Sequence, residues 1–275
     1  MSITVGTNAA SLNAQRNLAG TQRSLAANLG RLSSGMRINS ASDDAAGLGI
    51  SERLKAQIRG LSQASRNAND GVSMSQVAEG AMNEQAGILT RLRELAVQGA
   101  NGTLGASERG YISAEATELT AELDRISTVT EFNGVKMLGA DAGTISMQVG
   151  IHGTADDRID LTFAATDSTT LGVNALNFAT QAGAQGALAT IDTAIDSLSS
   201  SRATIGASQN RLVVTMNNLS SAHENLSAAN SRIRDVDVAE ETASMTRNQI
   251  LSQAGVAVLA QANQLPQAAL SLLRG

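Results

Sequence analysis

The sequence contains two histidines, and each stands beside carboxylates that could share a metal ion with it. His223-Glu-Asn-Leu-Ser227 begins like the H-E-x-x-H helix of zinc proteases, in which two histidines bind zinc and the glutamate acts as a general base. Here Ser227 occupies the place of the second histidine. The motif supplies one nitrogen ligand, so we interpret His223 as a polar position in a helix seam.

His152 stands near Asp156 and Asp157 in a segment that we expect to be a loop. Three potential ligands on a flexible loop are fewer than a dedicated cation site requires, and a solvated turn explains them as well. Gly47-Leu-Gly49 lacks the third glycine and the preceding strand of a dinucleotide-binding turn. We read Ser42-Asp43-Asp44-Ala45 as a helix N-cap. The sequence therefore predicts no catalytic, cofactor-binding or metal site and no enzyme activity.

The amino-acid composition excludes thiol chemistry and leaves little scope for aromatic stacking. The 275 residues include no cysteine, no tryptophan and only four aromatic residues, although 42% are hydrophobic. Zinc-thiolate sites, disulfides, cysteine nucleophiles and iron-sulfur clusters all require thiols. Aromatic platforms that stack bases or ligands are nearly absent. The apolar content is aliphatic, which suits packing between helices.

Charge is distributed unevenly along the chain. Residues 1–41 and 242–275 together carry a net charge of +6, and the 200 residues between them carry −11. The basic groups are too dispersed for a nucleic-acid surface. No run approaches 18 apolar residues, so we expect no membrane insertion. The N-terminus also lacks the basic and apolar regions of a secretory signal, so we expect no cleaved signal peptide.

The positions of large aliphatic residues predict long helices that pack along seams. In the C-terminal half, seven such residues recur at intervals of seven, and a matching column in the N-terminal half offers a partner, although four glycines interrupt it. The predicted core of this rod comprises Leu54, Leu61, Leu89, Ile191, Leu198, Ile205, Leu212, Leu219, Leu226 and Ile233.

The chain ends repeat the same spacing, and neither terminal helix can bury its apolar stripe alone. We expect the two ends to pair with each other, with neighbouring copies, or with both. Pro266 predicts a kink near the end of the last helix. The predicted polymerisation seam comprises Leu18, Leu25, Leu29, Leu32, Leu251, Val258, Leu265 and Leu272.

Between the helical halves, hydrophobic residues alternate with polar ones over 145–149 and 159–163, which is typical of a β-hairpin. Residues 164–185 have the composition of a loop-rich crossover with little core. The predicted fold is mainly α: a long antiparallel coiled-coil helical rod with paired terminal helices and a small β-hairpin.

Several stretches of the chain closely resemble bacterial flagellin, the filament subunit of the flagellum. The resemblance covers essentially the whole chain and is strongest at its ends. The stretches that carry it are Thr7–Asn17, Arg31–Ala41, Asp43–Leu48, Glu131–Leu138, Ser231–Asp237 and Gln249–Gln267.

The resemblance implies a short variant whose outer domain is reduced, and it divides the chain into six parts. It also implies a structural subunit that self-assembles into the filament used for motility. The parts are an inner-tube helix (1–41), rod helices (42–130), the β-hairpin (131–163), a reduced variable outer segment (164–185), a rod helix (186–236) and a second inner-tube helix (237–275).

The resemblance further implies an extracellular location, reached through the flagellar type III apparatus, and partners in the form of an export chaperone, the filament cap and hook-associated proteins. Leu89–Gln98 is similar to the segment read by the Toll-like receptor that senses flagellin, with Arg91, Leu95 and Glu115 at matching positions. We expect Arg91 and Leu95 to share a helix face that a partner could contact. A hook-filament junction protein, which shares the terminal helices of flagellin, is the alternative.

Overall fold

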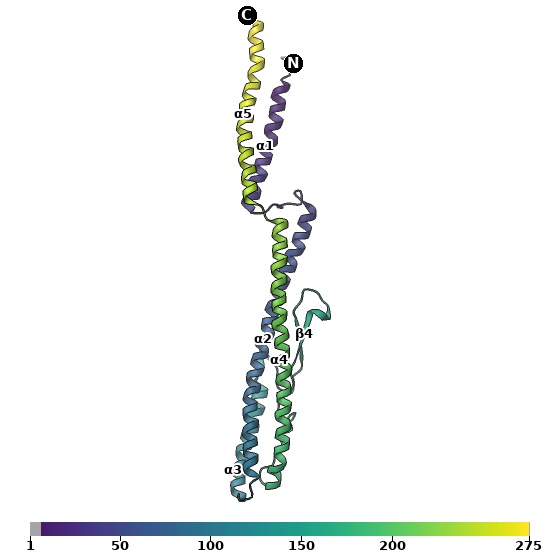
Figure 1. Ribbon diagram of the computed structural model, residues 1–275, viewed down its shortest axis with the longest axis vertical. Coiled ribbons are helices and arrows are strands. Elements are labelled where there is room, and N and C mark those ends of the chain that lie inside the picture. The colour runs from purple at the N-terminus through teal and green to yellow at the C-terminus, as the bar shows by residue number, and fades with distance from the viewer. Residues whose placement is uncertain (1–6, 275) are drawn as a thin grey trace. The chain divides into compact units, whose positions relative to one another are not determined.

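The computed structural model describes residues 7–274, with side chains described through Gln264. Helices dominate this part of the chain, and four short strands and one turn of 3-10 helix lie in its middle (Figure 1). In chain order the elements are α1 (Ala9–Ser34), α2 (Ala45–Gly99), α3 (Ala106–Val129), β1 (Glu131–Phe132), β2 (Val135–Lys136), β3 (Thr144–Gln148), η1 (Ala155–Asp157), β4 (Arg158–Thr162), α4 (Gln181–Arg234) and α5 (Val238–Arg274).

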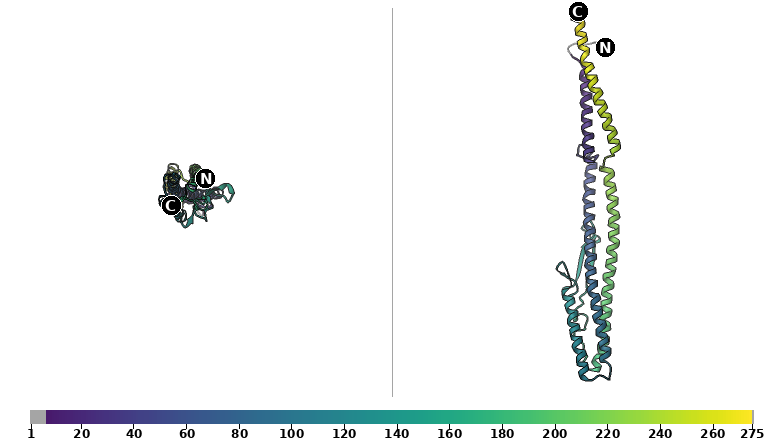
Figure 2. Two further views of the ribbon diagram at one scale, coloured as in Figure 1. Left: turned by 90° about the horizontal axis from the view of Figure 1, so that it is seen from below. Right: turned by 90° about the vertical axis from the view of Figure 1, so that its left-hand side faces the viewer.

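The chain forms two compact units, and their boundaries fall inside α2 and α4. Residues 57–224 form one unit, in which α2 and α4 lie side by side and antiparallel, with α3 against α2 (Figures 1 and 2). An ion pair of 2.6 Å joins Arg93 to Asp192 near one end of this pair of helices. Nearer the other end, Gln209 donates to Glu79 over 3.3 Å. The mainly α, antiparallel fold predicted from the heptads is confirmed.

The heptad positions differ in how fully this chain buries them. Leu54, Leu226 and Ile233 are half-buried. The remaining seven are buried, mostly in the central core of residues 57–224, and they are Leu61, Leu89, Ile191, Leu198, Ile205, Leu212 and Leu219.

The glycines within α2 do not interrupt it, and two of them admit close neighbours. A Cβ placed at Gly71 would lie 3.1 Å from Leu212 Cδ1 and 3.4 Å from Met147 Cε. One placed at Gly60 would lie 2.9 Å from Ile151 Cγ2. The conformational cost of these glycines is offset by the close packing of α4 and the hairpin on α2.

The predicted hairpin is confirmed as the pair β3 and β4, in which Ile145 faces Leu161 and Met147 faces Ile159. A second, two-residue ladder joins β1 to β2. Its turn is Asn133-Gly134, and both residues have positive φ (50° and 79°). An Asn-Gly pair between two extended segments is the usual sequence signal of such a turn.

Residues 164–180 are more ordered than their composition predicts. The expectation of a crossover with little core is wrong, because Leu171, Val173 and Phe178 are buried. Asp124 of α3 accepts hydrogen bonds from the backbone N–H of Ser168 (2.7 Å) and from its hydroxyl (2.8 Å). Polar side chains such as Asp124 and Ser168, which the sequence alone would place in solvent, here hold residues 164–180 against the helices through hydrogen bonds.

Candidate functional site: the terminal helix pair

The second unit, formed by the described parts of residues 1–56 and 225–275, contains the two terminal helices. In it α1 and α5 lie side by side and antiparallel (Figures 1 and 2). The Asn8 side chain caps α1 by accepting from Ser11 N–H (3.0 Å), and its amide donates to the Ala262 carbonyl (2.8 Å). At the other end, α1 stops at Gly35 in the left-handed conformation, with φ of 70°.

The inner seam of this pair is built from small and polar residues as much as from large apolar ones. Leu18, Leu25 and Leu32 are half-buried on α1. Leu18 packs against Gly255, where a Cβ would lie 3.2 Å from Leu18 Cδ1. Further along, the Ser11 hydroxyl donates to Asn263 Oδ1 over 2.8 Å. Close approach at a glycine and hydrogen bonds across the seam replace part of the expected leucine packing.

The column predicted on α5 lies at the edge of the seam with α1. Leu251 is 50% exposed and Val258 is 58% exposed. The seam itself contains Gly255 and Ala262, one heptad apart. Leu29 of α1 is also exposed. The side chains of Leu265 and Leu272 lie outside the described residues, and the α5 backbone continues past Pro266 to Arg274.

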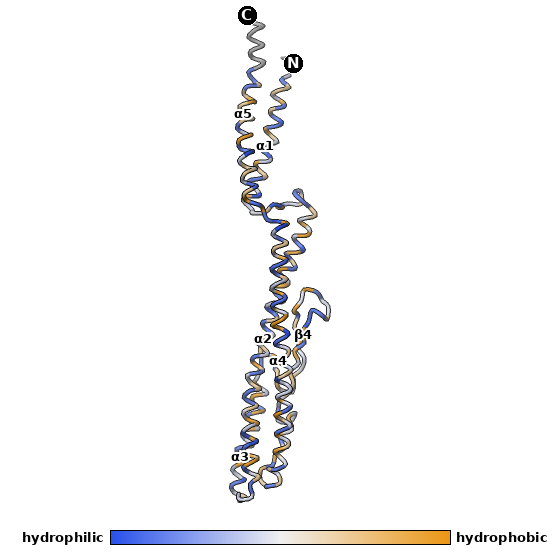
Figure 3. Tube along the Cα trace, viewed as in Figure 1, coloured by the Kyte–Doolittle hydropathy of each residue, from blue (hydrophilic) through white to orange (hydrophobic). Residues whose placement is uncertain are grey.

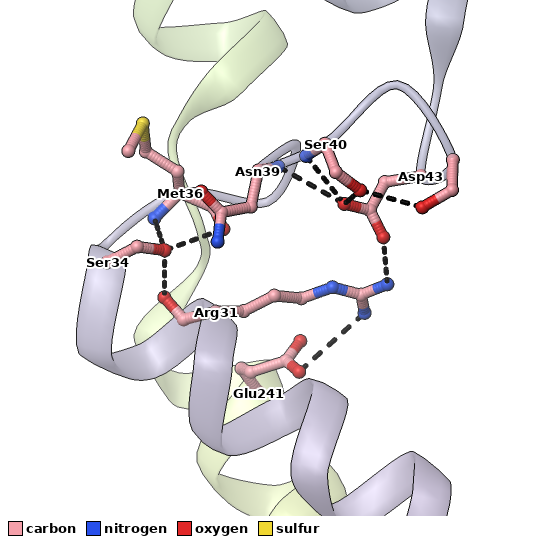
Figure 4. Close-up of polar contacts among 8 residues, drawn as sticks. Arg31, Ser34, Met36, Asn39, Ser40, Asp43 and Glu241 are labelled. Carbon is pink, nitrogen blue, oxygen red and sulfur yellow. Dashed lines mark hydrogen bonds and ion pairs between the residues drawn. The ribbon is translucent and has the colours of Figure 1, made fainter.

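A group of polar side chains joins the end of α1 to the start of α5 (Figure 4). The Arg31 guanidinium lies between two carboxylates, 3.9 Å from Asp43 and 3.7 Å from Glu241 of α5. Asp43 also accepts from the N–H and hydroxyl of Ser40 (both 2.9 Å) and from Asn39 N–H (3.3 Å). These Ser40 and Asn39 hydrogen bonds, together with the charge of Arg31, hold the pKa of Asp43 below its ordinary value.

The loop after α1 and the segment before α5 are also joined through their backbones. Met36 and Asp235 form an antiparallel bridge, and Arg37 N–H donates to the Arg234 carbonyl over 2.7 Å. The sequence predicts Asp43 and Asp44 as one helix cap, but the structure separates their roles. Asp44 caps α2 by accepting from Gly47 N–H (2.9 Å), whereas Asp43 organises the loop.

Several large hydrophobic side chains of the terminal helices remain exposed. Hydrophobic residues recur along both α1 and α5 (Figure 3). Apolar patches of this kind on a folded chain mark surfaces for association. The large exposed members are Leu12 and Leu29 on α1, and Val238, Ile250, Leu251, Val256 and Val258 on α5.

The residues similar to a receptor-binding segment are only partly accessible. Arg91 and Glu115 are exposed and form an ion pair of 2.7 Å between α2 and α3, and Glu94 adds a second contact to Arg91 at 2.9 Å. Leu95 is only 1% exposed and belongs to the core. The expectation that Arg91 and Leu95 share an accessible helix face is therefore wrong.

The described residues hold no constellation for metal chemistry. Between residues 7 and 274, no three histidine, aspartate or glutamate side chains gather as metal ligands. Asp157 accepts from the His152 backbone N–H (2.7 Å), so it organises the hairpin loop. In the same part of the chain, no helix is long and apolar enough to cross a membrane.

Long paired helices that leave large apolar side chains exposed are typical of an assembly subunit, a structural protein that is completed by other copies. Comparison with known proteins identifies the kind of assembly. The model of the bacterial flagellin N-terminal helical region matches residues 5–142, and that of the flagellin C-terminal helical region matches residues 188–273. The chain belongs to the bacterial flagellin family and is a subunit of the flagellar filament.

Individual relatives support this assignment over nearly the whole chain. The chain is 45% identical to the flagellar filament 33 kDa core protein of Treponema phagedenis and 44% identical to a flagellin of Bacillus subtilis, each over 97% of this chain and 98% of the relative. The crystal structure of Bacillus cereus flagellin covers 60% of this chain and 94% of its own, with 30% identity and a TM-score of 0.51. A putative flagellar hook-associated protein from Vibrio parahaemolyticus covers 70% of this chain and all of its own, with a TM-score of 0.60. At 14% identity it shares the fold alone.

Proposed function

We propose that copies of this chain associate in the filament through the exposed apolar side chains of α1 and α5. The proposal is supported chiefly by the exposure of Leu251 and Val258 on α5, which flank the seam that α1 occupies. Burying such side chains contributes about 1.5–3 kcal/mol each. A repeated interface would gain this stabilisation in every subunit.

The test is a charge placed at one of these exposed apolar positions. Val258→Asp would bury an unpaired carboxylate in the contact between subunits, which costs several kcal/mol and should raise the critical concentration for polymerisation about tenfold or more. The matched control is Asn217→Asp, an exposed position of α4 outside the terminal helices. Sedimentation and electron microscopy measure assembly, and circular dichroism checks folding. Filaments that grow equally well from both variants would contradict the proposal.

A second surface, that of the Arg91–Glu115 ion pair, is a candidate for recognition by the Toll-like receptor that senses flagellin. Both side chains are accessible on the chain, and Leu95 would act only by holding α2 in place. Arg91→Ala should weaken receptor signalling while leaving the helical circular dichroism unchanged. Arg93→Ala, which breaks a similarly exposed ion pair to Asp192, is the control. Equal signalling by both variants would remove this surface from consideration.

Membership of the family also leads us to propose that the chain is exported uncleaved to the outside of the cell through the flagellar apparatus. An export chaperone, the filament cap and hook-associated proteins are its proposed partners on that route. The intact mass of the subunit recovered from sheared filaments checks the absence of cleavage. A mass that corresponds to loss of an N-terminal segment would exclude it.

A further inference from the structure

Asn28 is a buried amide in the seam between α1 and α5. It is only 5% exposed. With the amide oriented to satisfy both of its ends, the nitrogen donates to Glu241 Oε1 (3.0 Å) and to the Ser24 carbonyl (2.9 Å). In that orientation the oxygen accepts from Met245 N–H (3.1 Å), Ser244 Oγ (3.2 Å) and Asn248 Nδ2 (3.2 Å). One side chain of α1 therefore forms hydrogen bonds with four residues of α5.

The apolar part of the same seam repeats every seven residues. Leu18, Leu25 and Leu32 are one heptad apart, as are Gly255 and Ala262 on the opposing helix. A displacement of α5 by one heptad would therefore keep leucine against small residues. Apolar contacts of this kind favour pairing but do not select one register.

The hydrogen bonds of Asn28 do not recur every seven residues along the seam. Displacement by one heptad would remove Asn28 from its group of partners and leave Glu241 without its amide donor. Removing one member of a buried hydrogen-bonded group costs more than the group contributes in net stability, so the wrong register is penalised. A single buried asparagine sets register in coiled coils by this means.

We propose that Asn28 is a positioning residue that fixes the register of α1 against α5. The Met36–Asp235 bridge joins the segments that follow α1 and precede α5, and it offers a competing explanation for the register. The proposal concerns pairing within one chain. It is therefore tested separately from association through the exposed apolar side chains.

Disulfide cross-linking reports register directly, because the chain has no cysteine of its own. A Cβ at Gly255 would lie 3.8 Å from Leu18 Cβ, which is an ideal separation for a disulfide. The native-register pair is Leu18→Cys with Gly255→Cys, and the first substitution also removes the Cδ1 atom that would crowd the new side chain. Leu25→Cys with Gly255→Cys is the displaced pair. Its residues are one heptad, or about 10 Å, out of register, too far to bond in the native arrangement.

Both pairs are made with Asn28, with Asn28→Leu and with the matched control Asn17→Leu, an exposed asparagine of α1. Oxidised protein is separated by denaturing electrophoresis, which distinguishes intramolecular from intermolecular products. We expect only the native pair to form with Asn28 and in the control. In Asn28→Leu the ratio of native to displaced products should fall about tenfold, the change produced by losing one to two hydrogen bonds.

Three results would overturn the proposal. Native cross-links alone in Asn28→Leu would assign the register to the other contacts of the pair, such as the Met36–Asp235 bridge and the Ser11–Asn263 hydrogen bond. Loss of both cross-links in that variant would show that Asn28 is required for pairing itself rather than for its register. Intermolecular products from the native pair would place the seam between copies. Because the cross-link forms within one chain, these results can be read even from a variant that does not polymerise.

Discussion

Asp124 should control the order of the segment that connects the hairpin to α4. Its carboxylate accepts both the N–H and the hydroxyl of Ser168, and Ser168 is buried. Hydrogen bonds to a charged group contribute about 1.5–3 kcal/mol each. Asp124 is half-buried, so solvent screening places the combined loss in Asp124→Ala at about 2–4 kcal/mol.

Local exchange of backbone amides is the appropriate measurement, because the loss should be confined to one segment. Val173 N–H donates to the Ser168 carbonyl over 2.8 Å, and its exchange reports whether the turn is closed. In Asp124→Ala we expect its protection to fall by at least about thirtyfold, the equivalent of 2 kcal/mol. Glu118→Ala, at an exposed position of the same helix, is the control. Unchanged protection of Val173 would refute the anchoring role of Asp124.

Three further predictions concern stability. Gly80→Ala should raise the free energy of unfolding by about 0.5–1 kcal/mol in urea titrations, because its Cβ would meet open space, whereas crowding at Gly71 should cancel that gain. Leu95→Ala should lower it by about 2–5 kcal/mol in the same assay, and a smaller effect would contradict the burial of Leu95. The pKa of Asp43 is lowered in the folded chain. The stabilisation of the folded state by its ionised carboxylate is therefore fully present above the unfolded pKa of about 4 and is lost as the pH falls below that value. Stability should therefore depend less on pH below 4 in Asp43→Asn.

Heptad spacing predicts the long helices well, because the interval between large aliphatic residues is itself the requirement for packing two helices along their length. Leu212 and Ile191 could be placed in a core from the sequence alone. The hairpin was equally predictable, since Ile145 and Leu161 lie on the same face of alternating strands.

Spacing could not indicate which partner each stripe meets. Leu251 and Val258 have the same interval as Leu18 and Leu25, yet they stay exposed at the edge of the seam, whose closest approach is at Gly255. The sequence does not mark Asn28 as a functional residue, since a lone asparagine on a helix is informative only when its partners on α5 are known. The Asp124–Ser168 anchor joins residues 44 positions apart, which no local pattern encodes.

The seam of the terminal pair combines half-buried leucines with buried amides and hydroxyls, while several large aliphatic side chains stay exposed. Such a pair buries only part of its apolar surface while it is alone in water, and burial of the rest is gained by mass action from neighbouring copies. Polymer growth and ordering of the chain ends are thus one coupled equilibrium. The melting temperature of α1 and α5 should rise with protein concentration, whereas that of residues 57–224, which have a core of their own, should not.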